Sequence, residues 1–158
     1  MQFEPLKIAE GHDQPTVRQQ SVFIENRVGQ LLQLARLFEQ TDIRILAISV
    51  VYSVDCAICR MILDDPEKGY EFLSGARFHV SEADLLVVSL PHGKRALLQM
   101  LAALLGGEVN IFYTYPLLSR PRGAPAVVVA TDSIEQAVHV LRERGFEVLS
   151  QQDLLDDR

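Results

Sequence analysis

The chain has 158 residues, enough for one ordinary domain or two small ones. Its composition, 48% hydrophobic and 23% charged, is that of a folded globular protein and argues against a disordered one. A formal net charge of -6 and a pI near 5.2 argue against nucleic acid or an anionic membrane surface as a partner.

The N-terminal stretch, residues 1–16, is expected to be an extended or disordered extension, because Pro5, Gly11 and Pro15 interrupt a polar sequence. Its start, MQFEP, lacks the basic and then apolar segments of a secretory signal. No apolar run in the sequence approaches the roughly 20 residues that span a bilayer. We therefore expect a cytoplasmic protein that does not cross a membrane.

Residues 17–83 show the pattern strand, helix, strand, strand, helix, strand. The first helix is indicated by apolar residues at spacings of three and four, and the second by Asp65, a favourable cap before a proline. In chain order we predict a strand at 17–24, a helix from about 31 to 38, a hairpin over 43–63 broken near Ser53-Val54-Asp55, a helix from Pro66 to Gly75 and a strand within 77–90.

Residues 84–158 repeat this pattern. The last helix has clear limits, since Asp132-Ser133-Ile134-Glu135 forms a capping box and Gly145 ends it. In chain order we predict a strand at 85–90, a helix over 94–105 stopped by Gly106-Gly107, strands at 109–117 and 126–131, a helix over 134–144 and a strand at 146–149.

The two halves align residue by residue without a gap through strand, helix and strand. LLQLARL, beginning at Leu31, matches LLQMLAA, beginning at Leu97, at a shift of 66 positions (97 − 31 = 66). Ile43-Arg44-Ile45 matches Val109-Asn110-Ile111 at the same shift. We infer an internal duplication of a βαββαβ unit, with 17–83 as the first copy and 84–158 as the second, which ends in a short acidic tail.

This duplication predicts an α+β fold. Each half would be a ferredoxin-like unit, an antiparallel four-stranded sheet with both helices on one face. A half of about 65 to 75 residues is marginally stable alone. We therefore expect the two units to pack side by side, and the chain to form a homodimer, because sheet edges and helix faces would otherwise stay exposed.

The first strand-to-helix turn carries a family resemblance. Asn26-Arg27-Val28-Gly29-Gln30-Leu31 follows the apolar strand SVFI and matches the Asn-x-x-Gly-x-Leu turn of the ACT domain, an amino-acid-binding regulatory module. DDPEKGYEFL, from Asp64, and GFEVLS, from Gly145, are similar to the second helix start and the last strand of tandem ACT proteins. The sequence thus resembles a tandem ACT domain protein over about residues 17–152. The proline that commonly precedes the glycine is here Val28.

The resemblance implies a ligand site where the first turn of one module faces the second strand of its neighbour. One pocket would combine Asn26, Arg27, Val28, Gly29, Gln30 and Leu31 with Asn110 and Ile111. The start of the helix would receive a carboxylate, and Gly29 would allow close backbone approach. Equally, Asn26 fits the role of a helix N-cap, which asparagine favours in any protein. A weaker, cationic second pocket would place His92, Gly93, Lys94 and Arg95, which have lost the turn motif, opposite Arg44.

The resemblance implies a non-catalytic regulatory protein that senses a free amino acid and modulates a separate enzyme of amino-acid metabolism or another regulator. No cofactor and no metal are expected. Two alternatives stay open: an enzyme using Cys56, His92 or Asp64, and a dimerisation scaffold without ligand. The pair Cys56 and Cys59 falls within a strand, where residues three apart point to opposite faces and do not converge on a metal. We interpret both as apolar filling.

Overall fold

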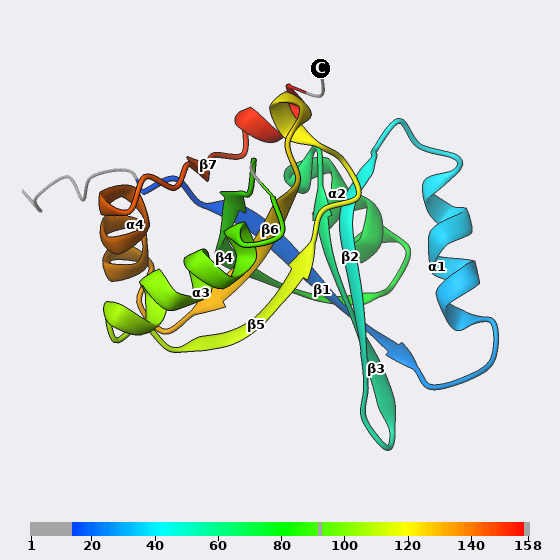
Figure 1. The fold of residues 1–158 in the computed structure, drawn as a ribbon. Coiled ribbons are helices and arrows are strands. Elements are labelled where there is room, and N and C mark those ends of the chain that lie inside the picture. The colour runs from blue at the N-terminus through cyan, green and yellow to red at the C-terminus, as the bar shows by residue number, and fades with distance from the viewer. Residues whose placement is uncertain (1–13, 92, 157–158) are drawn as a thin grey trace, which may run out of the picture.

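A computed structural model describes residues 14–91 and 93–156, in which helices and strands alternate as predicted (Figure 1). Residues 1–13, most of the predicted N-terminal extension, lie outside the described part, and 14–16 have no regular secondary structure. The predicted boundaries agree with the observed ones to within two residues, except that the strands predicted within 77–90 and at 85–90 are a single strand, His79–Ser89. The elements are β1 (Val17–Glu25), α1 (Gln30–Phe38), β2 (Ile45–Tyr52), β3 (Cys56–Leu63), α2 (Pro66–Gly75), β4 (His79–Ser89), α3 (Ala96–Gly106), β5 (Ile111–Pro116), η1 (Pro121–Gly123), β6 (Ala126–Thr131), α4 (Ile134–Glu143), β7 (Val148–Leu149) and η2 (Asp153–Leu155).

The strands form one continuous antiparallel sheet in the order β2-β3-β1-β4-β6-β5, with β7 also paired to β4. The strand β4 belongs to both halves. Its residues 79–85 pair with β1, and its residues 86–89 pair with β6. The predicted pair of βαββαβ units side by side is confirmed, with the two sheets fused through this shared strand. The predicted boundary between residues 83 and 84 falls inside β4, and the exchange of partners occurs between Leu85 and Leu86.

The fused sheet curls until its two outer strands meet at one point. Ala47 of β2 forms an isolated bridge with Leu117, just after β5, and the backbone N–H of Leu118 donates to the carbonyl of Leu46 at 2.7 Å. The inner face of the curl holds a core to which both halves contribute. Its main members are Val17, Leu46, Ala47, Ile62, Leu85, Val87, Tyr115, Val128, Leu149 and Leu154.

The helices cover the outer face of the curl, each half having its own second core. In the first half, Leu34 and Phe38 of α1 and Leu73 of α2 pack on the sheet, and Phe38 meets Phe72 edge-on at 5.6 Å between ring centroids. In the second half, Met100 and Leu104 of α3 and Leu141 of α4 do the same. None of the described helices is long and apolar enough to cross a membrane.

A buried polar cluster joins the two halves across the inner core. Gln19 of β1, only 1% exposed, accepts a hydrogen bond from the Tyr115 hydroxyl at 2.6 Å and donates one to the Tyr113 hydroxyl at 2.9 Å. The guanidinium of Arg60, from β3, lies 3.8 Å from the centroid of the Tyr113 ring. Burial raises the pKa of Tyr115, so its hydroxyl stays protonated and available as a donor.

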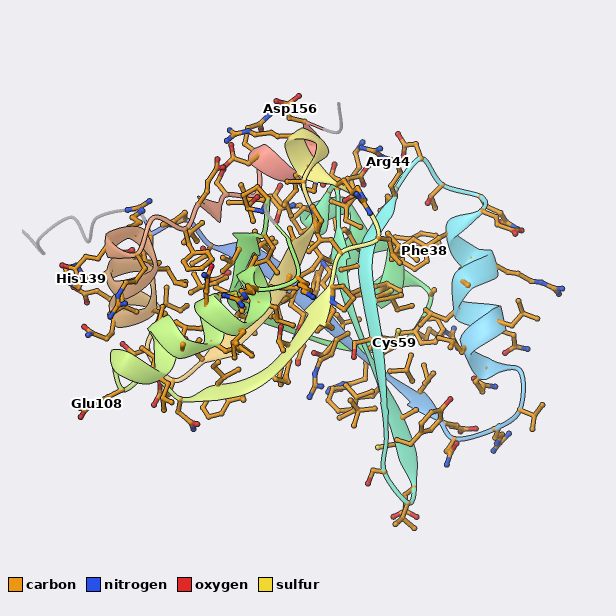
Figure 2. The ribbon with its side chains drawn as sticks, viewed as in Figure 1. Phe38, Arg44, Cys59, Glu108, His139 and Asp156 are labelled. Carbon is orange, nitrogen blue, oxygen red and sulfur yellow. The ribbon has the colours of Figure 1, made fainter. Side chains whose placement is uncertain are left out.

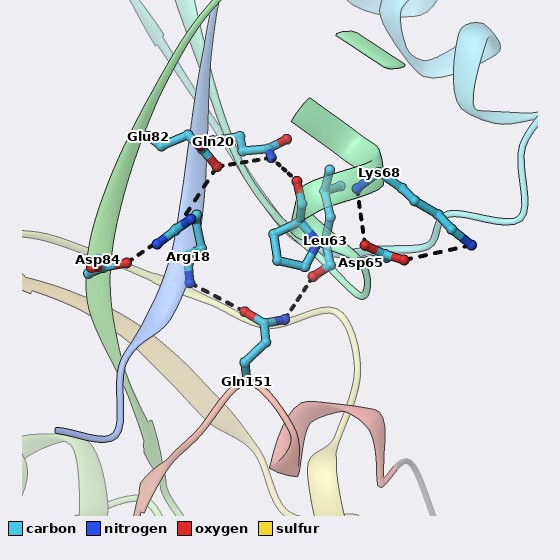
Figure 3. Close-up of polar contacts among 9 residues, drawn as sticks. Arg18, Gln20, Leu63, Asp65, Lys68, Glu82, Asp84 and Gln151 are labelled. Atoms are coloured by element: carbon cyan, nitrogen blue, oxygen red, sulfur yellow. Dashed lines mark hydrogen bonds and ion pairs between the residues drawn. The ribbon is translucent and has the colours of Figure 1, made fainter. Parts of the chain in front are cut away.

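The C-terminal segment is tied back to the first half through one side chain (Figure 3). The Gln151 amide nitrogen donates to the carbonyl of Leu63 at 3.0 Å, and its oxygen accepts from the backbone N–H of Arg18 at 3.3 Å. Nearby, buried Gln20 donates to the Pro66 carbonyl at the start of α2. These contacts hold α2, β1 and the end of the chain in one arrangement.

Candidate functional site

The corner between β1 and α1 is a tight turn fixed by its backbone. The N–H of Arg27 donates to the carbonyl of Glu25 at 2.8 Å, and the N–H of Gln30 donates to the carbonyl of Arg27 at 3.3 Å. Gly29 has φ 86° and ψ -6°, a left-handed conformation that glycine adopts without steric cost. The side chains of Arg27 and Glu25 form an exposed ion pair at 2.7 Å, which contributes little to stability.

This turn forms one wall of a pocket of about 610 Å³, which we call the corner pocket. Its apolar part is made by Ile24 of β1, Leu31 of α1 and Ala57 of β3. Its mouth carries the exposed residues 25–29, and Tyr52, at the end of β2, lies across from them. The pocket therefore combines a small apolar floor with a polar rim, which is the usual composition of a small-molecule site.

The first turn of α1 opens into this pocket without a side-chain cap. The N-cap residue is Gly29, and no side chain accepts a hydrogen bond from the first helical N–H groups. The interpretation of Asn26 as the N-cap is therefore wrong, because the chain turns once more before the helix starts. By contrast, Asp65 caps α2 as predicted, accepting from the N–H of Lys68 at 3.1 Å. The cap of α4 is Ser133, which accepts from the N–H of residue 136 at 3.4 Å, whereas Asp132, the first residue of the predicted capping box, accepts from the N–H of Asn110.

Asn110 and Ile111, predicted to face Asn26, do not line the corner pocket. The backbone of Asn110 exchanges hydrogen bonds with Asp132, whose carboxylate accepts its N–H at 3.0 Å. Ile111 packs on the outer core of the second half. Figure 1 shows the start of β5 beside the end of α3, at the opposite end of the molecule from the corner. Within one chain, the two asparagines are not brought together.

The corresponding corner of the second half is arranged differently. His92 lies outside the described residues, while Gly93, Lys94 and Arg95 are exposed in the turn before α3. Gly93 has a positive φ of 64°, as Gly29 does. Arg44, the predicted complement of this turn, is engaged elsewhere (Figure 2): its backbone N–H and its Nε donate to the Asp64 carboxylate at 2.9 and 3.2 Å.

Of the side chains proposed for an enzymatic alternative, Cys56 and Asp64 do not form a catalytic group, and His92 lies outside the described residues. Cys59 faces the outer core (Figure 2), and burial raises the pKa of its thiol to about 11, so the nucleophilic thiolate is scarce at neutral pH. Cys56 is half-buried on the opposite face of β3, and Asp64 is paired with Arg44. Across residues 14–91 and 93–156, no three His, Cys, Asp or Glu side chains are grouped to hold a metal ion.

Sequence reasoning missed the far wall of the corner pocket. Tyr52 and Ala57 line it because the strand register places Ala57 beside Ile24 and Tyr52 beside Ala57, near the tip of the β2–β3 hairpin (Figure 1). The hairpin turn itself was predicted, and the N–H of Ser53 closes it by donating to the carbonyl of Cys56 at 2.8 Å. The available signal was the predicted break near Ser53-Val54-Asp55, because it places the end of β2 and the start of β3 beside the end of β1, which lies opposite Cys56.

Comparison with known proteins places this geometry in a family. The family model described as "ACT domain pair" matches residues 15–157. No curated protein matches the chain by sequence.

Solved structures show the same fold. Protein BT0572 from Bacteroides thetaiotaomicron is 28% identical, with a TM-score of 0.80, over 89% of this chain and 96% of that one. The ligand-free regulatory subunit of aspartate kinase from Thermus thermophilus is 12% identical, with a TM-score of 0.58, over 82% and 92% of the two chains. The corresponding subunit from Thermus flavus is 11% identical, with a TM-score of 0.53, over 83% and 93%.

Proposed function

The chain belongs to the ACT domain pair family, and on this premise we propose that it is a regulatory protein, without catalytic activity of its own, that binds a free amino acid in the corner pocket. ACT domains are regulatory modules, which supports a ligand-dependent role. The proposal places the protein in the cytoplasm, where free amino acids are available to it.

The observation that carries the proposal is the uncapped start of α1 at a pocket with an apolar floor. The free N–H groups of a helix start attract a carboxylate. The carboxylate of Glu25 and the amide oxygen of Asn26, at the same mouth, are acceptors for an ammonium group. The apolar floor suits an aliphatic side chain. These features together match a zwitterionic amino acid with an apolar side chain.

Regulation would follow from a difference in ligand affinity between two arrangements of the protein. The corner pocket is built from β1, α1 and the β2–β3 hairpin, so a ligand there contacts three elements at once. An arrangement that brings these three elements together binds the ligand more tightly, and ligand binding therefore raises the population of that arrangement. The regulated partner would be a separate enzyme of amino-acid metabolism. Chains of this fold include the regulatory subunit of aspartate kinase from Thermus thermophilus.

A thermal-shift screen against the twenty amino acids tests the proposal directly. A ligand that binds the folded state raises the melting temperature by mass action. We expect a rise with one or a few aliphatic amino acids, confirmed by calorimetric titration. A flat response to all twenty would contradict amino-acid sensing and would favour a scaffold role.

Two asparagine variants locate the site. Asn26→Ala removes a polar group from the mouth of the pocket, and we expect ligand affinity to fall about 5- to 30-fold. Asn110→Ala is the matched control, since Asn110 lies outside the pocket in this chain and its hydrogen bonds to Asp132 are made by its backbone. Equal losses of affinity in both variants would show that a pocket containing both asparagines forms in the assembled protein.

A further inference from the structure

Helix α3 exposes a continuous apolar stripe to solvent. The sequence of the helix, ALLQMLAALLG, contains no charged residue. Its buried side is formed by Ala96, Met100, Ala103 and Leu104. On the opposite side, Leu98 is 66% exposed and Leu105 is 78% exposed, with exposed Ala102 between them and half-buried Leu101 beside it. We call these four residues the α3 stripe.

A stripe of this kind is unusual on a free surface. A surface helix normally carries charged or polar residues on its outward side, and a helix that is apolar all round is normally buried. Contiguous exposed apolar patches of a few hundred Å² commonly mark an interaction site. Around the first helix, 66 residues earlier, Leu98 and Leu101 correspond to exposed Leu32 and Ala35, but Ala102 and Leu105 correspond to the charged Arg36 and Glu39, which interrupt the apolar surface. The continuous form of the stripe is therefore specific to the second half.

We propose that the α3 stripe is the contact between two copies of this chain, packed with their α3 helices antiparallel about a two-fold axis. Side chains at spacings of three and four form one ridge along a helix. An antiparallel crossing between Leu101 and Ala102 places Leu98 against the partner's Leu105, and Leu101 against the partner's Ala102. The small side chain at the crossing lets the two helices approach to the usual 8–10 Å. The stripe is thus complementary to itself, as a two-fold interface requires.

The charges at the two ends of α3 fit the same arrangement. Lys94 and Arg95 precede the helix and Glu108 follows it, all three exposed. Figure 2 shows Glu108 at the outer end of α3. The antiparallel crossing brings Arg95 opposite the partner's Glu108 on both sides of the axis. It also sets the positive start of each helix beside the negative end of the other. A parallel pairing would instead place like charges together.

These charges favour a second copy over a membrane surface as the occupant. A helix that lies on an anionic membrane carries lysine and arginine along its polar side. The described polar side of α3 offers only Gln99, and the whole chain carries a net charge of -6. A stable dimer buries about 800 Å² of each partner. The stripe would form the apolar centre of such an interface, and the charged ends of α3 its rim.

Sedimentation equilibrium over a wide range of protein concentration tests the interface. We expect the wild type to have twice the 17.7 kDa mass of the chain. The variant Ala102→Arg/Leu105→Glu transfers the charge pattern of α1 onto α3, and we expect its dimer dissociation constant to rise at least about 100-fold. The matched control is Arg36→Glu/Glu39→Arg on α1, which should leave the dimer unchanged. A wild type that stays monomeric, or a dimer that persists in the α3 variant, would overturn the proposal.

Disulfide cross-linking tests the crossing point without disturbing the fold. In a Cys56→Ser background, Ala102→Cys places one thiol on each side of the two-fold axis, within reach of its symmetry mate. We expect a covalent dimer after mild oxidation. Arg36→Cys, the equivalent position on α1, should remain uncross-linked. Equal cross-linking of the two variants, or none at residue 102, would refute the antiparallel α3 contact.

Discussion

Helices α1 and α3 occupy the same place in the two halves but present different surfaces. Their buried sides are alike, since Leu34 and its counterpart Met100 are both at most 1% exposed in the outer cores. Their starts differ, because the Asn-x-x-Gly-x-Leu turn is present only before α1. Their outward sides also differ, because the exposed Arg36 interrupts the apolar surface of α1, whereas α3 carries no charged residue. The comparison shows that the two halves have similar residues where the helices pack on the sheet. They have different residues in the turn before each helix and on its exposed side.

The largest expected effect tests the buried sides of α1 and α3, in which the two helices are alike. Leu34→Ala and Met100→Ala each leave a cavity in an outer core, and we expect each to lower the free energy of unfolding by about 2–5 kcal/mol. Urea denaturation followed by circular dichroism measures this. The exposed substitution Gln33→Ala is the control and should stay within about 0.5 kcal/mol of wild type.

The same experiment tests whether the halves are independent. Because β4 pairs with β1 and with β6, we expect one cooperative transition in both variants. Two separate transitions, with each substitution affecting only one of them, would show that the halves unfold as separate units.

A smaller effect tests the turns before α1 and α3, in which the two helices differ. Gly29 and Gly93 have φ values of 86° and 64°, and a Cβ atom at either position would meet no atom within 4 Å. Alanine at each position should therefore cost a similar backbone strain, about 1–2 kcal/mol of stability. Only Gly29→Ala alters the corner pocket, so we expect ligand affinity to fall in that variant alone.

Calorimetric titration of the amino acid selected by the screen makes this measurement, with the melting temperature of each variant as the measure of strain. Loss of affinity in Gly93→Ala to the same degree would mean that the corner before α3 also binds ligand, and the two helices would then be functionally equivalent.

The smallest expected effect concerns the end of the second half. The first half has no equivalent segment, because its last strand, β4, continues directly into the second half. Asp153 accepts hydrogen bonds from the backbone N–H of Ser150 at 2.8 Å and from its hydroxyl at 2.9 Å, and pairs with Arg122. The backbone hydrogen bond, above all, lowers the pKa of this carboxyl. The ionised Asp153 carboxylate therefore contributes to stability above the pKa of the unfolded state, about 4. This contribution is lost as the pH falls through the lower pKa of the folded state.

Asp153→Asn removes this contribution. Thermal melts from about pH 7 down to about pH 2 should show a slightly lower melting temperature than wild type near neutrality and a smaller difference at the acidic end. A difference that stays constant over the whole range would exclude the ionised carboxylate as its cause.

Much of the fold was open to prediction because it depends on local signals. Alternation, helical spacing and the caps at Asp65 and Ser133 set the elements, and the shift of 66 positions revealed the duplication. The fusion of the sheets through β4 was not visible, since an uninterrupted strand pattern over 77–90 does not show where its partners change. That change depends on distant strands, which compete for the two edges of β4.

The site was predictable on one side only. The residues of the β1–α1 turn lie together because they are consecutive in the chain. Their expected complement, Asn110, required knowledge of how the halves are joined. The halves meet through β4, and β2 approaches the end of β5 near Ala47 and Leu117, so the start of β5 lies far from α1. Tyr52 lines the pocket instead, because it pairs with Ala57, which itself lies beside Ile24 of β1.

The shared strand β4 also determines how far the pair can be divided. A cut before His79 removes the last strand from the first sheet, and a cut after Ser89 removes the first strand from the second sheet. A cut between Leu85 and Leu86 would leave each fragment with its own strand pairings, but it would divide the inner core that both halves build. The duplicated gene product is thus no longer a string of two separable modules but an indivisible unit, and neither half is expected to be exchanged, swapped or inherited without the other.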